Sequence, residues 1–324
     1  MTAKTRIDLL FGFLGSGKTT LARRLIEEWG PKRRLALIVN EFGDVGVDGD
    51  ILAGNNIDLI QLSSGCLCCT LKGSLLSAVE ELATKAQLDH IVIEATGVAE
   101  PEEMLASFSE PGFLDRFEVG PLVTVVDTPK YLKIRDMLGP FYEAQVEKSD
   151  LIILNKLDLA TAELADQVRD EVAELNKAAL VRFAERCDID LLEVLDGPPS
   201  QALARFAAGD GGGHEHQDHE HHGHDHDHGA LHAPAESFVL DTPDPLDRAA
   251  LAALFAEAPK GLWRAKGFVK IDDADWLVQF AMGELEITAA ESRSRHYLVF
   301  IGDGLDRDLF ARGIAAARIK EGAV

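Results

Sequence analysis

The chain is poor in cysteine, in long apolar runs and in positive charge. It has four cysteines among 324 residues, and three of them lie within four positions, so they cannot form a framework of disulfides. No stretch approaches the ~18 apolar residues of a membrane span. The net charge of −23 argues against general binding to nucleic acid or to an anionic membrane, because both need a basic surface. We therefore expect a cytoplasmic protein with reduced thiols that binds neither nucleic acid nor membrane.

What the chain has is a regular alternation of apolar and helical segments between about residue 6 and residue 200. Short runs rich in Val, Ile and Leu are typical of strands buried on both faces of a parallel sheet. The predicted strands are 6–13, 35–40, 57–62, 90–95, 121–127 and 151–156, and the main predicted helices are 18–30, 71–86 and 101–108. This order predicts an α/β fold with a doubly wound, mostly parallel sheet.

The composition changes abruptly after this region. Residues 207–235 hold nine of the eleven histidines among Gly, Asp and Glu, and they have almost nothing to bury, so we predict a disordered linker. Further strand patterns at 236–241, 262–271, 275–282 and 296–302, with helical patterns at 245–258 and 306–320, predict a smaller α+β domain. The expected divisions are 1–206, 207–235 and 236–324.

The sequence GFLGSGKT at residues 12–19 fits the pattern G-x-x-x-x-G-K-[ST]. It lies between a predicted strand and a predicted helix, which is the context that this motif requires. Backbone N–H groups of such a loop converge on phosphate oxygens at the helix N-terminus. Lys18 would neutralise the β- and γ-phosphates, and Thr19 would bind Mg²⁺. The motif residues Gly12, Gly15, Ser16, Gly17, Lys18 and Thr19 make the first domain a predicted P-loop NTPase.

The sequence Asn155-Lys156-Leu157-Asp158 ends a buried strand and favours guanine as the base. The Asp158 carboxylate can accept hydrogen bonds from guanine N1–H and N2–H, a pairing that adenine cannot offer. Asn155 and Lys156 would brace the loop and cover the base. A helix-capping turn is the alternative interpretation of these four residues.

The segment Glu94-Ala95-Thr96-Gly97 also follows a predicted strand, in the place of the D-x-x-G segment of P-loop GTPases. Glu94 could hold the Mg²⁺ shell through water, and the Gly97 amide could meet the γ-phosphate, which gives both a predicted catalytic role. The alternative is that Glu94 only caps the next helix. Asp127 lies at another strand end and is expected to be structural.

Cys66, Cys68 and Cys69 form a thiol cluster just before a predicted helix. Thiolates are metal ligands, and a helix N-terminus lowers the pKa of a thiol. Three sulfurs suit Zn²⁺ or Cu⁺, and Glu41, in the loop after the second strand, is the first candidate for a fourth ligand. Packing cysteines or a redox site are the alternatives, although C-x-C-C is not the redox spacing C-x-x-C. Cys187 is predicted to be an isolated structural thiol.

These motifs together resemble the CobW family of P-loop GTPases, whose members look like metal chaperones and insertases. The matching stretches are 12–20, 40–48, 64–71, 93–101, 155–159 and, in the C-terminal domain, 263–269. The resemblance implies GTP hydrolysis coupled to transfer of a transition metal to a client metalloprotein. It implies that Gly15 to Thr20 hold the phosphates and that the three clustered cysteines are the metal motif. It does not settle the metal, since similar proteins are associated with zinc, cobalt or nitrile hydratase.

We therefore expect a Mg²⁺-dependent GTPase in which water attacks the γ-phosphate. Zn²⁺ is the first choice for the metal that it carries, and Co²⁺ is the second. The eight histidines between His214 and His228 favour metal buffering over a passive linker. Turnover is expected to be slow, because no arginine finger can be identified; the client could supply one. A nucleotide-dependent homodimer stays open. The rival hypotheses are a passive metal buffer and an ATP-dependent phosphotransferase.

One local cluster in the C-terminal domain remains unexplained by these motifs. Trp263 is expected to belong to the core rather than to a ligand site. Arg264 and Lys266 could bind a partner or respond to nucleotide, and the sequence does not decide between the two.

Overall fold

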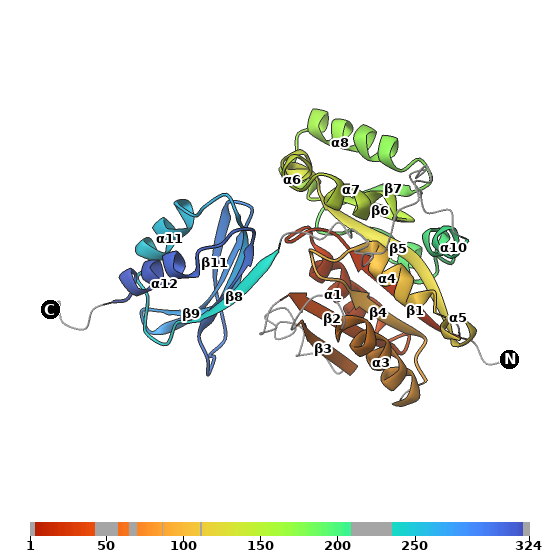
Figure 1. The fold of residues 1–324 in the computed structure, drawn as a ribbon, viewed down its shortest axis with the longest axis horizontal. Coiled ribbons are helices and arrows are strands. Elements are labelled where there is room, and N and C mark those ends of the chain that lie inside the picture. The colour runs from red at the N-terminus through yellow and green to blue at the C-terminus, as the bar shows by residue number, and fades with distance from the viewer. Residues whose placement is uncertain are drawn as a thin grey trace, which may run out of the picture.

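The computed structural model describes residues 4–42, 58–64, 70–85, 87–110, 112–208 and 235–319. They form two units, each built on its own sheet (Figure 1). Among these residues, no helix combines the length and the apolar character that crossing a bilayer requires.

The first unit is a seven-stranded sheet in the order β3-β2-β4-β1-β5-β6-β7. All six neighbouring pairs in that order are parallel. The strands are β1 (Thr5–Phe11), β2 (Leu35–Phe42), β3 (Asp58–Ser64), β4 (His90–Glu94), β5 (Phe117–Asp127), β6 (Leu151–Asn155) and β7 (Leu180–Phe183). The predicted α/β fold with a doubly wound parallel sheet is confirmed.

Helices cover both faces of this sheet (Figure 1). They are α1 (Lys18–Trp29), α3 (Thr70–Lys85), α4 (Pro101–Phe108), α5 (Phe113–Arg116), α6 (Tyr131–Leu138), α7 (Pro140–Glu147), α8 (Ala162–Leu175), α9 (Leu192–Leu195) and α10 (Gln201–Ala207), with the 3-10 helices η1 (Thr128–Lys130) and η2 (Leu157–Leu159). Successive side chains of a strand point to opposite faces. In β1, Leu9 therefore packs with residues of α3, α4 and α10, whereas Leu10 packs with residues of α1 and α9.

The second unit is a five-stranded antiparallel sheet in the order β11-β10-β9-β12-β8. Its elements are β8 (Glu236–Asp241), α11 (Arg248–Ala256), β9 (Leu262–Ile271), β10 (Ala274–Ala281), β11 (Glu284–Ala289), β12 (Tyr297–Gly302) and α12 (Arg307–Ala316). One face packs beneath α11 and α12. The other face contributes to an apolar cluster shared with α6, α7 and α8 of the first unit. The expected smaller α+β architecture is thus present.

Two strands of the structure are missing from the sequence prediction. β7 has four residues, and each is exposed or half-buried, so it lacks the continuous apolar run of a buried parallel strand. β11 alternates exposed and half-buried residues at the edge of its sheet. Edge strands bury little, so hydrophobicity alone does not reveal them.

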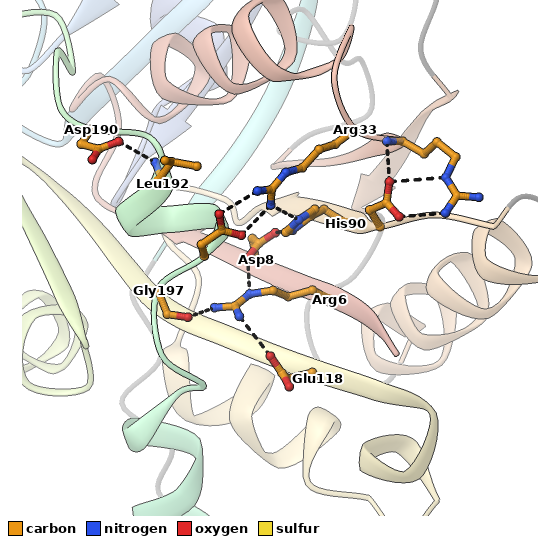
Figure 2. Close-up of polar contacts among 11 residues, drawn as sticks. Arg6, Asp8, Arg33, His90, Glu118, Asp190, Leu192 and Gly197 are labelled. Carbon is orange, nitrogen blue, oxygen red and sulfur yellow. Dashed lines mark hydrogen bonds and ion pairs between the residues drawn. The ribbon is translucent and has the colours of Figure 1, made fainter. Parts of the chain in front are cut away.

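A buried polar network lies at the amino ends of β1 and β4 (Figure 2). Asp8 is fully buried, and its carboxylate lies 2.8 Å from His90 Nδ1 and 3.3 Å from Arg6 Nε. Arg33 Nη1 continues the network, 3.0 Å from His90 Nε2 and 2.6 Å from the Asp196 carboxylate. Ligands of open α/β sheets bind at the carboxyl ends of the strands. We therefore assign this network a structural role.

Candidate functional site

The phosphate loop joins β1 to α1, as the sequence predicted. Gly17 is the N-cap of α1 and has a φ of 118°, a left-handed conformation that glycine adopts without strain. A methyl group on Gly17 would also lie 2.5 Å from Asn155 Nδ2. Ser16 is buried, Lys18 and Thr19 form the first turn of α1 and Thr20 follows them. The backbone N–H groups of this turn have no partner within the helix, so they are available to an anion.

Lys18 is buried, and its ammonium donates hydrogen bonds to the carbonyls of Gly12 at 2.7 Å and Phe13 at 3.3 Å. The pKa of Lys18 is lowered to about 8, chiefly by burial and to a smaller extent by the charge of Arg264, while the Glu94 carboxylate acts in the opposite direction and raises it. A bound phosphate would offset the lost hydration of this cation. The loop therefore holds a cation that favours an anionic ligand.

The Thr19 hydroxyl donates to Glu94 Oε1 at 2.7 Å, so the end of β4 meets the first turn of α1. Burial raises the pKa of the Glu94 carboxyl, while Lys18 and Thr19 lower it. The next helix, α4, has Glu100 as its N-cap, so Glu94 does not cap it. Glu94 Oε2 and Ser16 Oγ are buried and have no hydrogen-bond partner among the described residues. Such oxygens fit Mg²⁺, its water shell and a phosphate group.

Gly97 packs against the phosphate loop so closely that only glycine fits. A methyl group on Gly97 would lie 2.5 Å from Leu14 Cδ2 and 2.7 Å from the Leu14 backbone nitrogen. The segment that starts at Glu94 therefore runs directly beside residues 12–17. This is the place where a γ-phosphate would meet both segments.

Asn155, at the end of β6, ties two segments of the site together. Its Nδ2 donates to the Ser16 carbonyl at 2.8 Å, and its Oδ1 accepts from the Cys187 N–H at 2.7 Å. Cys187 is fully buried, and its sulfur lies 3.4 Å from the Gly17 carbonyl. Burial raises the pKa of the Cys187 thiol to about 12. The sequence identified Cys187 as structural, and the structure shows that it lies against the phosphate loop.

Lys156 and Asp158 form the rest of this loop. Lys156 has a φ of 63°, and its ammonium donates to the buried Asp127 carboxylate at 2.7 Å. Asp127 therefore braces the loop, in line with the structural role that was expected. Asp158 is exposed in η2, and the next helix, α8, is capped by the Thr161 side chain instead. This leaves the Asp158 carboxylate accessible to a base.

The turn between β10 and β11 of the second unit contacts η1 and α6, which follow β5 in the first unit. Lys130 donates to the Ala281 carbonyl and Lys133 donates to the Met282 carbonyl, each at 3.0 Å. Lys130 also lies 2.6 Å from the Glu284 carboxylate. Trp263 is buried, as expected of a core residue. The sequence gives no signal for these contacts, because they join residues about 150 positions apart.

The predicted metal ligands cannot be located in the same way. Cys66, Cys68 and Cys69, the Glu41 side chain and the histidines from His214 to His228 lie outside the part of the chain that the structure describes. Within the described part, no group of three or more His, Cys, Asp or Glu side chains is arranged to hold a metal ion. The metal motif therefore stays a sequence-based prediction.

Comparison with known proteins gives a match for each unit. Residues 7–183 match the family described as CobW/HypB/UreG, nucleotide-binding domain. Residues 235–318 match the cobalamin synthesis protein cobW C-terminal domain.

Three relatives illustrate the extent of the similarity. The zinc chaperone CobW of Sinorhizobium sp is 36% identical over 198 residues, which are 52% of this chain and 56% of that protein. The zinc chaperone CobW of Pseudomonas aeruginosa is 34% identical over 221 residues, which are 58% of this chain and 59% of that protein. The zinc-regulated GTPase metalloprotein activator 1 of Schizosaccharomyces pombe is 33% identical over 205 residues, which are 59% of this chain and 48% of that protein. The chain thus spans between 48% and 59% of these relatives' lengths. With one family match over more than half of its length and a second over its antiparallel sheet, the chain belongs to the CobW/HypB/UreG family and carries a CobW C-terminal domain.

Proposed function

We propose that this protein hydrolyses GTP to GDP and phosphate and uses this cycle to bind a transition metal and deliver it to a client metalloprotein. The observation that carries the proposal is the convergence of Lys18, the Thr19–Glu94 contact and Asn155 at the carboxyl ends of β1, β4 and β6. Zinc is the first choice of metal, in keeping with the names of the relatives, and cobalt is the second.

The phosphates would be held by Lys18 and by the backbone N–H groups of residues 15–20. Lys18 exchanges its two carbonyl partners for phosphate oxygens, and its charge stabilises the negative charge that builds up during transfer. Thr19 and Glu94 orient the Mg²⁺ site, Thr19 by its hydroxyl and Glu94 through water. Mg²⁺, when bound, neutralises charge on the β- and γ-phosphates. The attacking group is a water molecule beside Gly97.

The base would be read by Asp158, whose accessible carboxylate can accept from guanine N1–H and N2–H. Asn155 contributes indirectly, because it holds the phosphate loop and the segment around Cys187 at a fixed distance. Lys156, anchored on Asp127, would cover the base with its aliphatic stem. This arrangement supports GTP rather than ATP as the substrate.

The metal would be held by the thiolates of Cys66, Cys68 and Cys69, with Glu41 as the candidate fourth ligand. Soft sulfur ligands suit Zn²⁺ and, less well, Co²⁺. The histidine run would capture metal at modest affinity and pass it to this site. Nucleotide-dependent ordering of loops is how P-loop GTPases change their binding surfaces. Coupling between nucleotide and metal would follow if a loop near the γ-phosphate carries a metal ligand.

The first experiment measures phosphate release from GTP and from ATP in the presence of Mg²⁺. We expect turnover of GTP that is lost in Lys18→Ala and absent when Mg²⁺ is chelated. Equal turnover of ATP, or transfer of phosphate to another acceptor, would favour a phosphotransferase instead.

The second experiment tests the coupling. Zn²⁺ and Co²⁺ affinities are measured by competition with a chromogenic chelator, with Mg²⁺ and either GTP or GDP bound. We expect a large difference between the two nucleotide states that disappears in the triple variant Cys66→Ala/Cys68→Ala/Cys69→Ala. Equal affinities in both states would leave only a metal buffer that happens to bind nucleotide.

A further inference from the structure

The sheet of the second unit meets the phosphate loop directly. The ring centroids of Phe13, in the loop, and Trp263, on β9, are 6.1 Å apart. A methyl group on Gly15 would lie 3.3 Å from the Cβ of Ala281, at the end of β10. Both contacts involve residues within the predicted phosphate-binding motif. The edge formed by the start of β9 and the end of β10 is therefore a neighbour of the nucleotide.

Arg264 lies on this edge, next to Trp263, and faces the first unit. It pairs with Ala281 on β10 and with Ile301 on β12. Directly paired residues of antiparallel strands project to the same face. Ile301 packs in the apolar cluster that both units share, whereas the following residue, Ala265, packs beneath α11 and α12. The register therefore places Arg264 on the face of the sheet that packs against the first unit, where Phe13 of the phosphate loop also lies.

The electrostatics of the loop agree with this geometry. Burial is the main reason why the pKa of Lys18 is lowered and that of Glu94 is raised, and the positive charge of Arg264 lowers both. The influence of a charge decays with distance through screening. The charge of Arg264 therefore acts on the two groups that flank the expected γ-phosphate.

We propose that Arg264 is a catalytic residue of the nucleotide site, contributed by the C-terminal domain of the same chain. Its guanidinium contacts oxygens of the transferred phosphoryl group. A guanidinium is planar, permanently charged and matched to phosphate oxygens in pairs, which suits this task better than a second ammonium. This inference rests on the proposed GTP hydrolysis.

In the reaction, the oxygen of water bonds to the γ-phosphorus, and the bond from the γ-phosphorus to the bridging oxygen breaks. The electron pair of that bond remains on the β-phosphate of GDP, and the proton of the water ends on inorganic phosphate or solvent. Arg264 neither gains nor loses a proton; it stabilises the charge that the transition state spreads over the phosphoryl oxygens. The chain therefore contains the arginine that the sequence left unassigned, and basal turnover does not depend on a client.

The test uses the full-length protein with Mg²⁺, and compares Arg264→Ala and Arg264→Lys with Arg248→Ala. Arg248 is a matched control because it is an arginine of the same domain that lies at the start of α11. Its Cζ lies 4.6 Å from the centroid of the Trp276 ring. The measurements are kcat and KM for GTP, the affinity for GDP, and the affinity for GDP with aluminium fluoride, which mimics the transition state.

We expect kcat to fall by about 100-fold or more in Arg264→Ala, towards the ~10³-fold effect of an arginine finger. KM and GDP affinity should stay within about threefold, because the contact acts in the transition state. The affinity for GDP with aluminium fluoride should fall in Arg264→Ala by a factor similar to that of kcat. Arg264→Lys should keep only part of the wild-type kcat and of this affinity. Arg248→Ala should have the wild-type values of both.

Two results would overturn the inference while leaving the proposed function intact. One is that Arg264→Ala keeps the wild-type kcat and the wild-type affinity for GDP with aluminium fluoride. The other is an equal loss of affinity for GDP and for the transition-state mimic, which would mean that Arg264 only supports the fold. A wild-type protein that hydrolyses no GTP would overturn the proposed function and the catalytic role of Arg264 together.

Discussion

Lys18 should make nucleotide binding depend on pH in a range where few other groups titrate. Burial gives its ammonium a pKa of about 8, well below the usual value of 10.5, and adjacent phosphates would raise this pKa in the complex. As pH rises through 8, the free protein loses the proton and the complex keeps it. Binding then has to take up a proton, so affinity falls.

The expected size follows from the factor 1 + 10^(pH − pKa). Affinity should be reduced about 1.3-fold at pH 7.5, about twofold at pH 8.0 and about fourfold at pH 8.5. Proton uptake should be about 0.5 per nucleotide at pH 8.0. Before phosphate binds, the same burial costs the folded state roughly 3 kcal/mol at neutral pH, a cost that disappears as pH rises from 8 to 10.5.

Calorimetric titration with Mg²⁺–GDP in HEPES and in Tris gives the number of protons, because these buffers differ in their heats of ionisation. Lys18→Met is the control, since any proton uptake that remains in it belongs to the nucleotide. Tight binding by wild type with less than about 0.1 proton taken up between pH 7.5 and 8.5 would refute the reasoning.

Three further substitutions test other parts of the molecule. Asn155→Ala leaves the Ser16 carbonyl and the Cys187 N–H without partners, at about 1–3 kcal/mol each, so the affinity for GDP should fall at least tenfold. An unchanged affinity in calorimetry would show that these two hydrogen bonds are dispensable for binding. Asp158→Asn should move the preference from GTP towards xanthosine triphosphate, because a carboxamide can donate to the carbonyl that replaces the 2-amino group; competition binding measures it, and a variant that still prefers GTP contradicts the base assignment. His90→Ala should lower the free energy of unfolding by about 3–5 kcal/mol, because the buried Asp8 carboxylate loses its ring partner. Urea unfolding measures this loss, and the double variant Asp8→Leu/His90→Leu should recover most of it. A loss below about 1 kcal/mol would contradict the prediction.

The fold and the arrangement of the nucleotide site follow mostly from short stretches of sequence. The phosphate loop can be predicted because Gly17 and Lys18 belong to a pattern whose geometry is set within a few residues. The direction of a parallel sheet then brings Glu94 and Asn155 to the same edge, since each ends a buried strand. The fold class needed only the alternation of apolar runs and helical patterns.

The rest depends on contacts between distant residues, which no local pattern encodes. The bond between Asn155 and the N–H of Cys187 needs the loop after β7, and β7 itself is too exposed to be found from hydrophobicity. The position of Arg264 depends on how the two units pack, which is decided by the apolar face of the second sheet. The sequence could mark Arg264 as unusual but could not say what it faces.

The burial of Cys187 has a practical consequence for the chemistry of the other three thiols. With a pKa of about 12, Cys187 is almost entirely protonated at neutral pH, and its fully buried sulfur is closed to reagents. Alkylation of the native protein therefore leaves Cys187 out, so any thiol that is labelled before unfolding is one of the other three, and unfolding adds Cys187. The chain carries its own internal standard for thiol counting, and protection of the three by a metal can be followed against no background.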